Sequence, residues 1–124
     1  MVDILYKEEA YQIIGVCFDV HSTLGHGFLE AVYSEALAIE LNKKNIPFEL
    51  NKELNIQYKD RILQKRYYAD LVVFDKIIIE LKAIETLAPE HTAQVLNYLK
   101  ATKMRLGLLI NFGAPKLQYE RIIL

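Results

Sequence analysis

The segment from Arg66 to Lys82, with the sequence RYYADLVVFDKIIIELK, constrains the fold more than any other part of the chain. Two apolar runs at 71–73 and 77–79 flank the polar pair Asp75-Lys76. This pattern is typical of two strands joined by a tight turn. Both runs are apolar at consecutive positions, which predicts that protein covers both faces of the hairpin.

Three charged residues, Asp70, Glu80 and Lys82, lie inside or at the ends of these strands. A charge buried in a strand is costly unless it is paired or binds metal. Glu80 and Lys82 are two residues apart and therefore point to the same face. The turn length decides whether Asp70 joins them. A two-residue loop turns Asp70 to the other face, whereas a three-residue loop at 74–76 places Asp70 directly opposite Glu80.

Two interpretations of this trio are open from the residues alone. Directly opposed residues have Cβ atoms about 4.5–5.5 Å apart. Two carboxylates about 4 Å apart repel by roughly 4 kcal/mol at an effective dielectric constant of 20. A divalent cation between Asp70 and Glu80 would reverse the sign of that energy. The alternative is a charged strand end that reaches solvent, where Lys82 neutralises Glu80.

Length and composition indicate one globular domain over residues 1–124. The hydrophobic fraction of 52% argues against disorder, and the formal net charge of −1 argues against strong non-specific polyanion binding. A local basic patch is still compatible with that charge. Cys17 is the single cysteine, which permits no internal disulfide and suits a reducing cytoplasm. The sequence shows neither a signal peptide nor a membrane span, so we expect a cytoplasmic protein with no membrane partner.

Hydrophobic periodicity and turn signals predict eight elements in the order α-α-β-β-β-α-β-β. This order is typical of an α+β fold with helices against one mixed sheet. We expect the last strand to lie at an edge of the sheet. The predicted helices cover about 5–24, 28–45 and 89–102, and the strands cover about 48–58, 61–73, 77–82, 106–110 and 117–124.

Two residues of the first two helices have both an ordinary and a functional interpretation. His21 shares the apolar face of the first helix, where a hydrogen-bonded core histidine is favoured over a ligand. Glu30 lies in the first turn of the second helix, where its charge suits the positive N-terminus. The functional alternative is that Glu30 points into the same site as Asp70 and Glu80.

The second strand and the third helix also carry side chains of interest. Arg66 and Tyr68 share a strand face with Asp70, where they would receive a phosphodiester backbone, although ordinary strand composition is the favoured interpretation. A helix that starts at Pro89 places four side chains on one face: His91, Gln94, Val95 and Tyr98.

The spacing Gly27-x-x-Glu30-x-x-Tyr33 resembles the signature of the GxxExxY proteins, a family placed in the PD-(D/E)XK nuclease superfamily. Ala69 stands where the superfamily name has proline. The resemblance implies a restriction-endonuclease-like αβββαβ core with an extra N-terminal helix and a C-terminal strand. The match continues in order through Val20-His21, Leu24-Gly25, Tyr68-x-Asp70, Glu80-x-Lys82, Gln94-x-x-x-Tyr98 and Leu108-x-Ile110-Asn111-Phe112-Gly113.

The resemblance also implies a set of site residues. Asp70, Glu80 and the backbone carbonyl of Leu81 would hold Mg²⁺ or Mn²⁺, and Glu30 would hold a water on the metal or a second ion. Lys82 would orient the attacking water or stabilise developing charge. Gln94 would hold Lys82 or a phosphate oxygen. Six residues would support the site: His21, Tyr33, Arg66, Tyr68, His91 and Tyr98.

These expectations lead to one function and two alternatives. The leading hypothesis is a Mg²⁺-dependent phosphodiesterase, an endo- or exonuclease that acts on DNA, with RNA as the second choice. The first alternative is a non-catalytic nucleic-acid-binding or assembly module that keeps the nuclease fold. A homodimer working as one unit is a further alternative.

Overall fold

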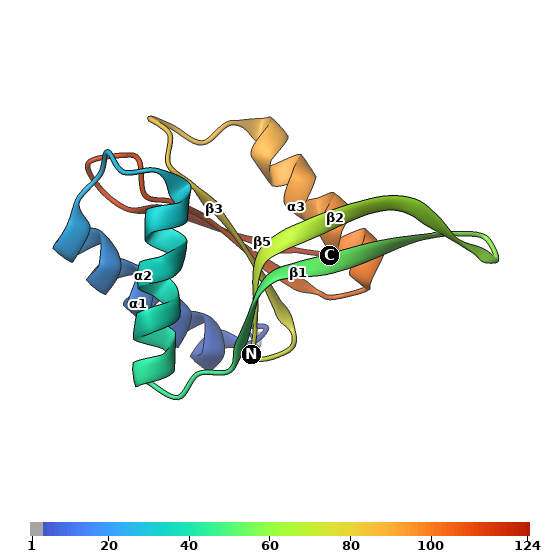
Figure 1. Ribbon diagram of the computed structural model, residues 1–124, viewed down its shortest axis with the longest axis horizontal. Coiled ribbons are helices and arrows are strands. Elements are labelled where there is room, and N and C mark those ends of the chain that lie inside the picture. Colours follow the sequence, from blue (N-terminus) through green and yellow to red (C-terminus); the bar gives the residue numbers. More distant parts are fainter. Residues whose placement is uncertain (1–3) are drawn as a thin grey trace.

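The eight elements form in the order that the sequence predicts. The computed structural model describes residues 4–124 (Figure 1). The third helix and the first three strands cover the predicted residues, and the other elements differ from their predicted ranges by one or two residues at one or both ends. The elements are α1 (Lys7–Leu24), α2 (Glu30–Lys43), β1 (Phe48–Tyr58), β2 (Arg61–Val73), β3 (Ile77–Lys82), α3 (Pro89–Thr102), β4 (Leu106–Asn111) and β5 (Gln118–Ile123).

One five-stranded mixed sheet runs in the order β1-β2-β3-β4-β5. β3 and β4 are parallel and are connected through α3, whereas the other neighbours are antiparallel. Nearly all residues of β3 and all residues of β4 are buried, which explains their continuous apolar sequences. β5 lies at an edge of the sheet, as predicted.

Helices cover both faces of this sheet, with α1 and α2 on one side and α3 on the other (Figure 1). Alternate residues of β3 enter the two cores: Ile77 and Ile79 pack with α1 and α2, while Ile78 packs with Val95 and Leu99 of α3. The fold is therefore α+β, a mixed sheet between two helical layers.

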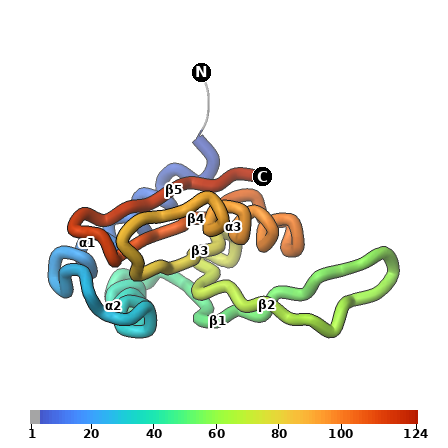
Figure 2. The backbone as a smooth tube through the Cα atoms, turned by 90° about the horizontal axis from the view of Figure 1, so that it is seen from above, coloured from blue at the N-terminus to red at the C-terminus, as the bar shows by residue number. Residues whose placement is uncertain are grey.

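β1 and β2 extend beyond the sheet as a long hairpin, which we call the arm (Figure 2). The face alternation of β2 breaks where this arm leaves the sheet. Leu71 packs on the α1/α2 side, yet Ala69 packs with Val72 on the α3 side. The break therefore falls at Asp70. Across the ladder, Asn51 has a positive φ of 49°, which marks a local change of twist in β1.

Two large apolar side chains in or next to helices α1 and α2 are exposed. The exposed fraction is 78% for Leu29 and 48% for Phe18. Leu29 is the N-cap residue of α2 and has extended backbone angles, so it lies outside the helical periodicity. Among residues 4–124, no helix is long and apolar enough to cross a membrane.

Candidate active site

The register of the β2–β3 hairpin determines where the acidic side chains lie. Val73 pairs with Ile77, and Leu71 lies opposite Ile79. The loop therefore contains the three residues 74–76, which confirms the longer of the two predicted turns. Continuing the same register places Asp70 opposite Glu80.

Asp70 and Glu80 are held by backbone groups of the opposite strand. The Asp70 N–H donates a hydrogen bond to Glu80 Oε1 at 3.0 Å, and the Leu81 N–H donates to Asp70 Oδ2 at 2.8 Å. These bonds begin where the regular pairing of β2 with β3 ends, at Leu71 and Ile79. Each carboxylate thus uses one oxygen to accept a backbone hydrogen bond from the opposite strand, and its second oxygen takes part in neither bond.

Burial and charge both disfavour the ionised form of Glu80. Its exposed fraction is only 4%. Burial, and then the negative charge of Asp70, raise the pKa of Glu80 to about 8. The hydrogen bond from the Asp70 N–H and the positive charge of Lys82 oppose this rise. The predicted repulsion is therefore present, but burial is the larger cause. A proton or a cation would relieve both effects.

Lys82 ends β3 beside these acids and is half-buried. Its carbonyl accepts a hydrogen bond from the Phe112 N–H at 2.8 Å. Its neighbour on β4, Asn111, is fully buried, and its Oδ1 accepts bonds from the N–H groups of Ile84 and Gly113. Asn111 therefore holds the segment that follows Lys82 in the chain, through the Ile84 N–H. Asn111 is not among the site residues expected from sequence, although a polar residue at the end of an apolar strand signals such a role.

Glu30 and Gln94 lie on opposite sides of the sheet. The roles expected of Glu30 and Gln94 at one acidic site require helices that flank the same face of the hairpin, and this expectation is wrong. Glu30 is exposed at the start of α2 and lines a cavity of about 440 Å³ with Asp70 and Leu81. Gln94 is half-buried on α3 and lines a different cavity with Tyr98. The cause is topological, since α3 crosses between β3 and β4 on the face that α1 and α2 leave free.

Asp70 and Glu80 are the two carboxylates that the hairpin brings together. Within residues 4–124, no three His, Cys, Asp or Glu side chains lie close enough to hold one metal ion. Glu30 borders the same cavity as Asp70 without joining such a group. The protein oxygens that could bind one metal ion here are therefore those of Asp70 and Glu80, together with nearby backbone carbonyls.

Tyr33 holds the loop that precedes Glu30. Its hydroxyl donates to the Gly25 carbonyl at 2.7 Å and accepts from the Phe28 N–H at 3.2 Å. Its ring stacks on Phe112, with centroids 4.6 Å apart. Tyr33 thus positions the start of α2 and is itself fully buried.

His21 and His91 also make structural contacts. His21 Nε2 hydrogen-bonds the carbonyl oxygen of Ala114 at 3.0 Å, which fits the core interpretation favoured from sequence. His91 Nδ1 accepts a hydrogen bond from the Ala88 N–H at 3.0 Å, which caps the start of α3.

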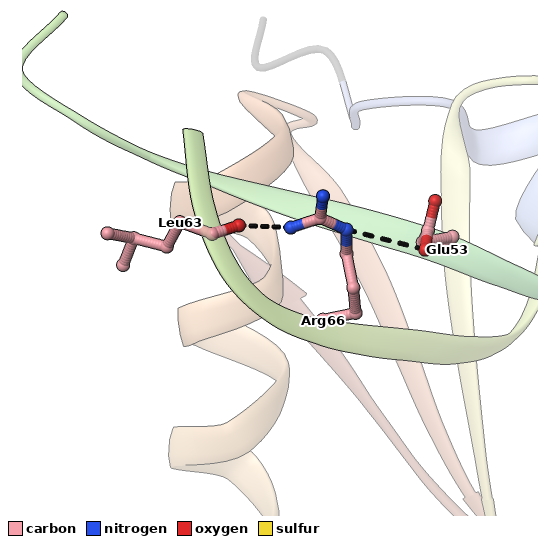
Figure 3. A network of polar contacts seen from close by, with 3 residues as sticks. All are labelled: Glu53, Leu63 and Arg66. Atoms are coloured by element: carbon pink, nitrogen blue, oxygen red, sulfur yellow. Dashed lines mark hydrogen bonds and ion pairs between the residues drawn. The ribbon is translucent and has the colours of Figure 1, made fainter. Parts of the chain in front are cut away.

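Arg66 and Tyr68 belong to the arm. Arg66 pairs with Glu53 at 3.5 Å and hydrogen-bonds the Leu63 carbonyl, as Figure 3 shows. It is four residues from Asp70, a separation of roughly 13 Å along a strand. The exposed fraction of Tyr68 is 54%. Arg66 therefore lies away from the acidic pair, and its ion pair with Glu53 joins the two strands of the arm.

Tyr98 lies close enough to the acids to sense their charges. Its pKa is raised to about 12, first by burial and then by the negative charges of Glu80 and Asp70. Tyr67, which is not among the site residues expected from sequence, faces Tyr98 with ring centroids 5.9 Å apart. This contact is hard to predict from the sequence, because the break in alternation at Asp70 changes which β2 residues face α3.

Comparison with known proteins places this geometry in a family. The model of the PD-(D/E)XK nuclease superfamily matches residues 7–122. The chain belongs to the PD-(D/E)XK nuclease superfamily. Its five-stranded mixed sheet flanked by helices has the restriction-endonuclease-like fold of that superfamily. Nucleases of this superfamily generally use divalent metal ions.

A solved structure supports the fold assignment. The protein titled "Crystal structure of SSO0001" is similar to this chain with a TM-score of 0.61 and 19% sequence identity. The similarity covers 95% of this chain and 60% of that protein. At this identity, the likeness shows the fold alone. No curated protein sequence matches the chain significantly.

Proposed function

We propose that this domain is a metal-dependent phosphodiesterase that cleaves nucleic acid. One observation carries the proposal: the buried Glu80 carboxylate faces Asp70 where β2 and β3 stop pairing, in a member of a nuclease superfamily. We further propose Mg²⁺ or Mn²⁺ as the ion, DNA as the substrate before RNA, and the GxxExxY proteins as the subfamily. A cytoplasmic setting is retained because Cys17, the single cysteine, is free and buried.

The residues present fit a hard divalent cation. Asp70 and Glu80 each offer a carboxylate oxygen, and the Leu81 carbonyl would complete the protein ligands, as carboxylates and carbonyls suit Mg²⁺. A bound cation would supply Lewis-acid activation of a water nucleophile and neutralise charge on the phosphate. The raised pKa of Glu80 supports this assignment, because burial leaves the carboxylate with a strong need for a positive partner.

The other proposed residues act around this pair. Lys82 lies within the electrostatic reach of Glu80 and would orient the attacking water or stabilise developing negative charge. Glu30 would act through a water molecule from the α2 side, where it shares a cavity with Asp70. Gln94 would contact a phosphate oxygen from the α3 side, on the wall that it shares with Tyr98.

Thermal unfolding with and without Mn²⁺, alongside plasmid nicking, tests this proposal. Binding to the folded state alone raises the melting temperature. The wild type should show such a rise, and Asp70→Asn should lose both the rise and cleavage. Lys82→Ala should keep or strengthen the rise while losing cleavage, because it removes a competing positive charge and no ligand. Asp19→Asn, an exposed aspartate on α1, is the matched control and should behave as wild type.

Two results would redirect the proposal. No metal-induced rise in the wild type at millimolar Mn²⁺ would favour a non-catalytic module that binds nucleic acid or assembles with partners. An unchanged rise in Asp70→Asn would place the ion elsewhere. Sedimentation of the active protein would test whether two copies work as one unit.

A further inference from the structure

A groove between the arm and α3 adjoins the acidic pair. Its volume is about 670 Å³, within the range of about 300–1,000 Å³ for sites that hold small ligands. Leu54 and Ile56 of β1, with Ala93 and Ala101 of α3, give it apolar surface. Tyr98 lies in its wall and senses the charges of Glu80 and Asp70, so the groove begins beside the proposed active site.

The groove offers an aromatic ring with an accessible surface. Tyr67 lines it from β2 and has an exposed fraction of 37%. The ring leans on Tyr98 at an interplanar angle of 51°, so Tyr98 supports Tyr67 without stacking flat against it. The Nζ atom of Lys65 lies 5.8 Å from the Tyr67 ring centroid. An aromatic ring beside a cation is the combination that binds a nucleobase and its phosphate.

The remaining polar side chains match the same ligand. Gln57, Gln94 and Asn97 place amide groups around the groove, and amides hydrogen-bond the edges of bases. Lys100 and Lys103 lie at the end of α3 and line the groove with a single acidic residue, Glu90. This local positive charge occurs in a chain whose formal net charge is −1, and it complements a phosphate backbone.

We propose that this groove holds an unpaired nucleobase stacked on Tyr67, so that the domain prefers single-stranded or frayed nucleic acid to intact duplex. The inference rests on the proposed function, because it treats the bound strand as the substrate of Asp70 and Glu80. A paired base has both faces covered within the duplex, so stacking on a tyrosine requires that the base leave the stack.

Fluorescence anisotropy in EDTA tests this inference without cleavage. The probes are a labelled oligothymidylate, a blunt duplex of the same length, and the same single strand with abasic residues. Wild type should bind the single strand most tightly. Tyr67→Ala should weaken that binding roughly 5- to 100-fold, because each base–aromatic stack contributes at this level. Tyr67→Phe should bind within about twofold of wild type, since the phenyl ring still stacks.

The abasic strand allows base removal and Tyr67→Ala to be combined in a double-mutant cycle of binding measurements. A general loss of stability would not produce coupling between these two changes. Removing the bases should weaken binding by wild type at least as much as Tyr67→Ala does, and it should cause a smaller further loss in that variant. Tyr11→Ala is the matched control, because Tyr11 is 78% exposed on α1 and lies on the other side of the sheet. It should leave binding unchanged.

A second variant keeps the test decisive if Tyr67→Ala does not fold. Replacing Lys100 and Lys103 by glutamine should flatten the salt dependence of single-strand binding, because fewer counterions are released. Tighter wild-type binding to duplex, equal wild-type affinity for abasic and normal strands, or an unchanged salt dependence in the lysine variant would each overturn the inference. Cleavage by a protein that fails these tests would leave the proposed function intact. Base-dependent binding without cleavage would support the stacking of an unpaired base on Tyr67 and would overturn the proposed function.

Discussion

Replacing Glu80 with glutamine isolates the electrostatic cost of the buried carboxylate. Glu80 is 4% exposed and faces Asp70, and its pKa is raised from 4.5 to about 8 by burial and by the Asp70 charge. Glutamine has nearly the same shape and keeps an Oε1 acceptor for the Asp70 N–H, which now bonds Glu80 at 3.0 Å. The substitution therefore removes the charge and retains the hydrogen bond that joins the two strands.

The raised pKa determines the sign and size of the effect. Below a pH of about 4.5, the carboxyl group is protonated in both folded and unfolded chains, and wild type bears no penalty. As the pH rises toward about 8, the unfolded chain ionises first, and wild type loses stability by up to about 1.4 kcal/mol for each pH unit. Above that pH the penalty is complete, and Glu80→Gln should be more stable than wild type by roughly 3–5 kcal/mol.

Urea unfolding in EDTA, repeated from pH 5 to pH 9, measures this difference. The two free energies of unfolding should be close at pH 5 and should diverge as the pH rises. Glu8→Gln, an exposed glutamate on α1, is the matched control and should follow wild type throughout. Parallel curves for wild type and Glu80→Gln would refute the reasoning, because they would show that Glu80 ionises equally easily in both states.

Two further predictions concern neighbours of Glu80. Asp70→Asn should move the pKa of Glu80, followed by NMR of its side-chain carboxyl carbon, to a value between 4.5 and about 8, because it removes the second cause of the shift and leaves burial in place. A complete return to 4.5 would contradict that order of causes. Asn111→Leu should lower the free energy of unfolding by more than about 2 kcal/mol, because each buried backbone group left unpaired costs about 1–3 kcal/mol and Asn111 Oδ1 serves two N–H groups. Asn42→Leu, at an exposed position, should change it little, and equal losses in a urea titration would remove the proposed role of Asn111.

The order and type of the elements were predictable because local signals agreed along the chain. The apolar runs of β3 and β4 are buried on both faces, and Pro89 begins α3 at the predicted residue. The sequence allows two turn lengths, and each turn length determines one hairpin register. The observed pairing of Val73 with Ile77 corresponds to the three-residue loop. These features depend on spacing along the chain, which a sequence contains directly.

The placement of the outer site residues was not predictable in the same way. Gln94 and Glu30 were assigned by role, and no local pattern states which face of a sheet a helix will cover. Arg66 was placed beside Asp70 because strict alternation puts both on one strand face. The alternation breaks at Asp70, and Arg66 instead binds Glu53 on the arm. Spacing along a strand predicts a shared face only while the twist is regular.

The break at Asp70 also explains how one pair of acids would serve two faces of the sheet in the proposed reaction. Below it, Leu71 and Val73 pack under α1 and α2, so Asp70 borders the cavity that contains Glu30. Beyond it, β2 turns toward α3, and Tyr67 enters the groove on the opposite side. The regular pairing of β2 with β3 ends just before Asp70. From there, hydrogen bonds between each carboxylate and a backbone N–H of the opposite strand hold the two strands together. A nucleic-acid strand bound in the α3 groove would therefore reach Asp70 and Glu80 from one side of the sheet, and Glu30 would act from the other side.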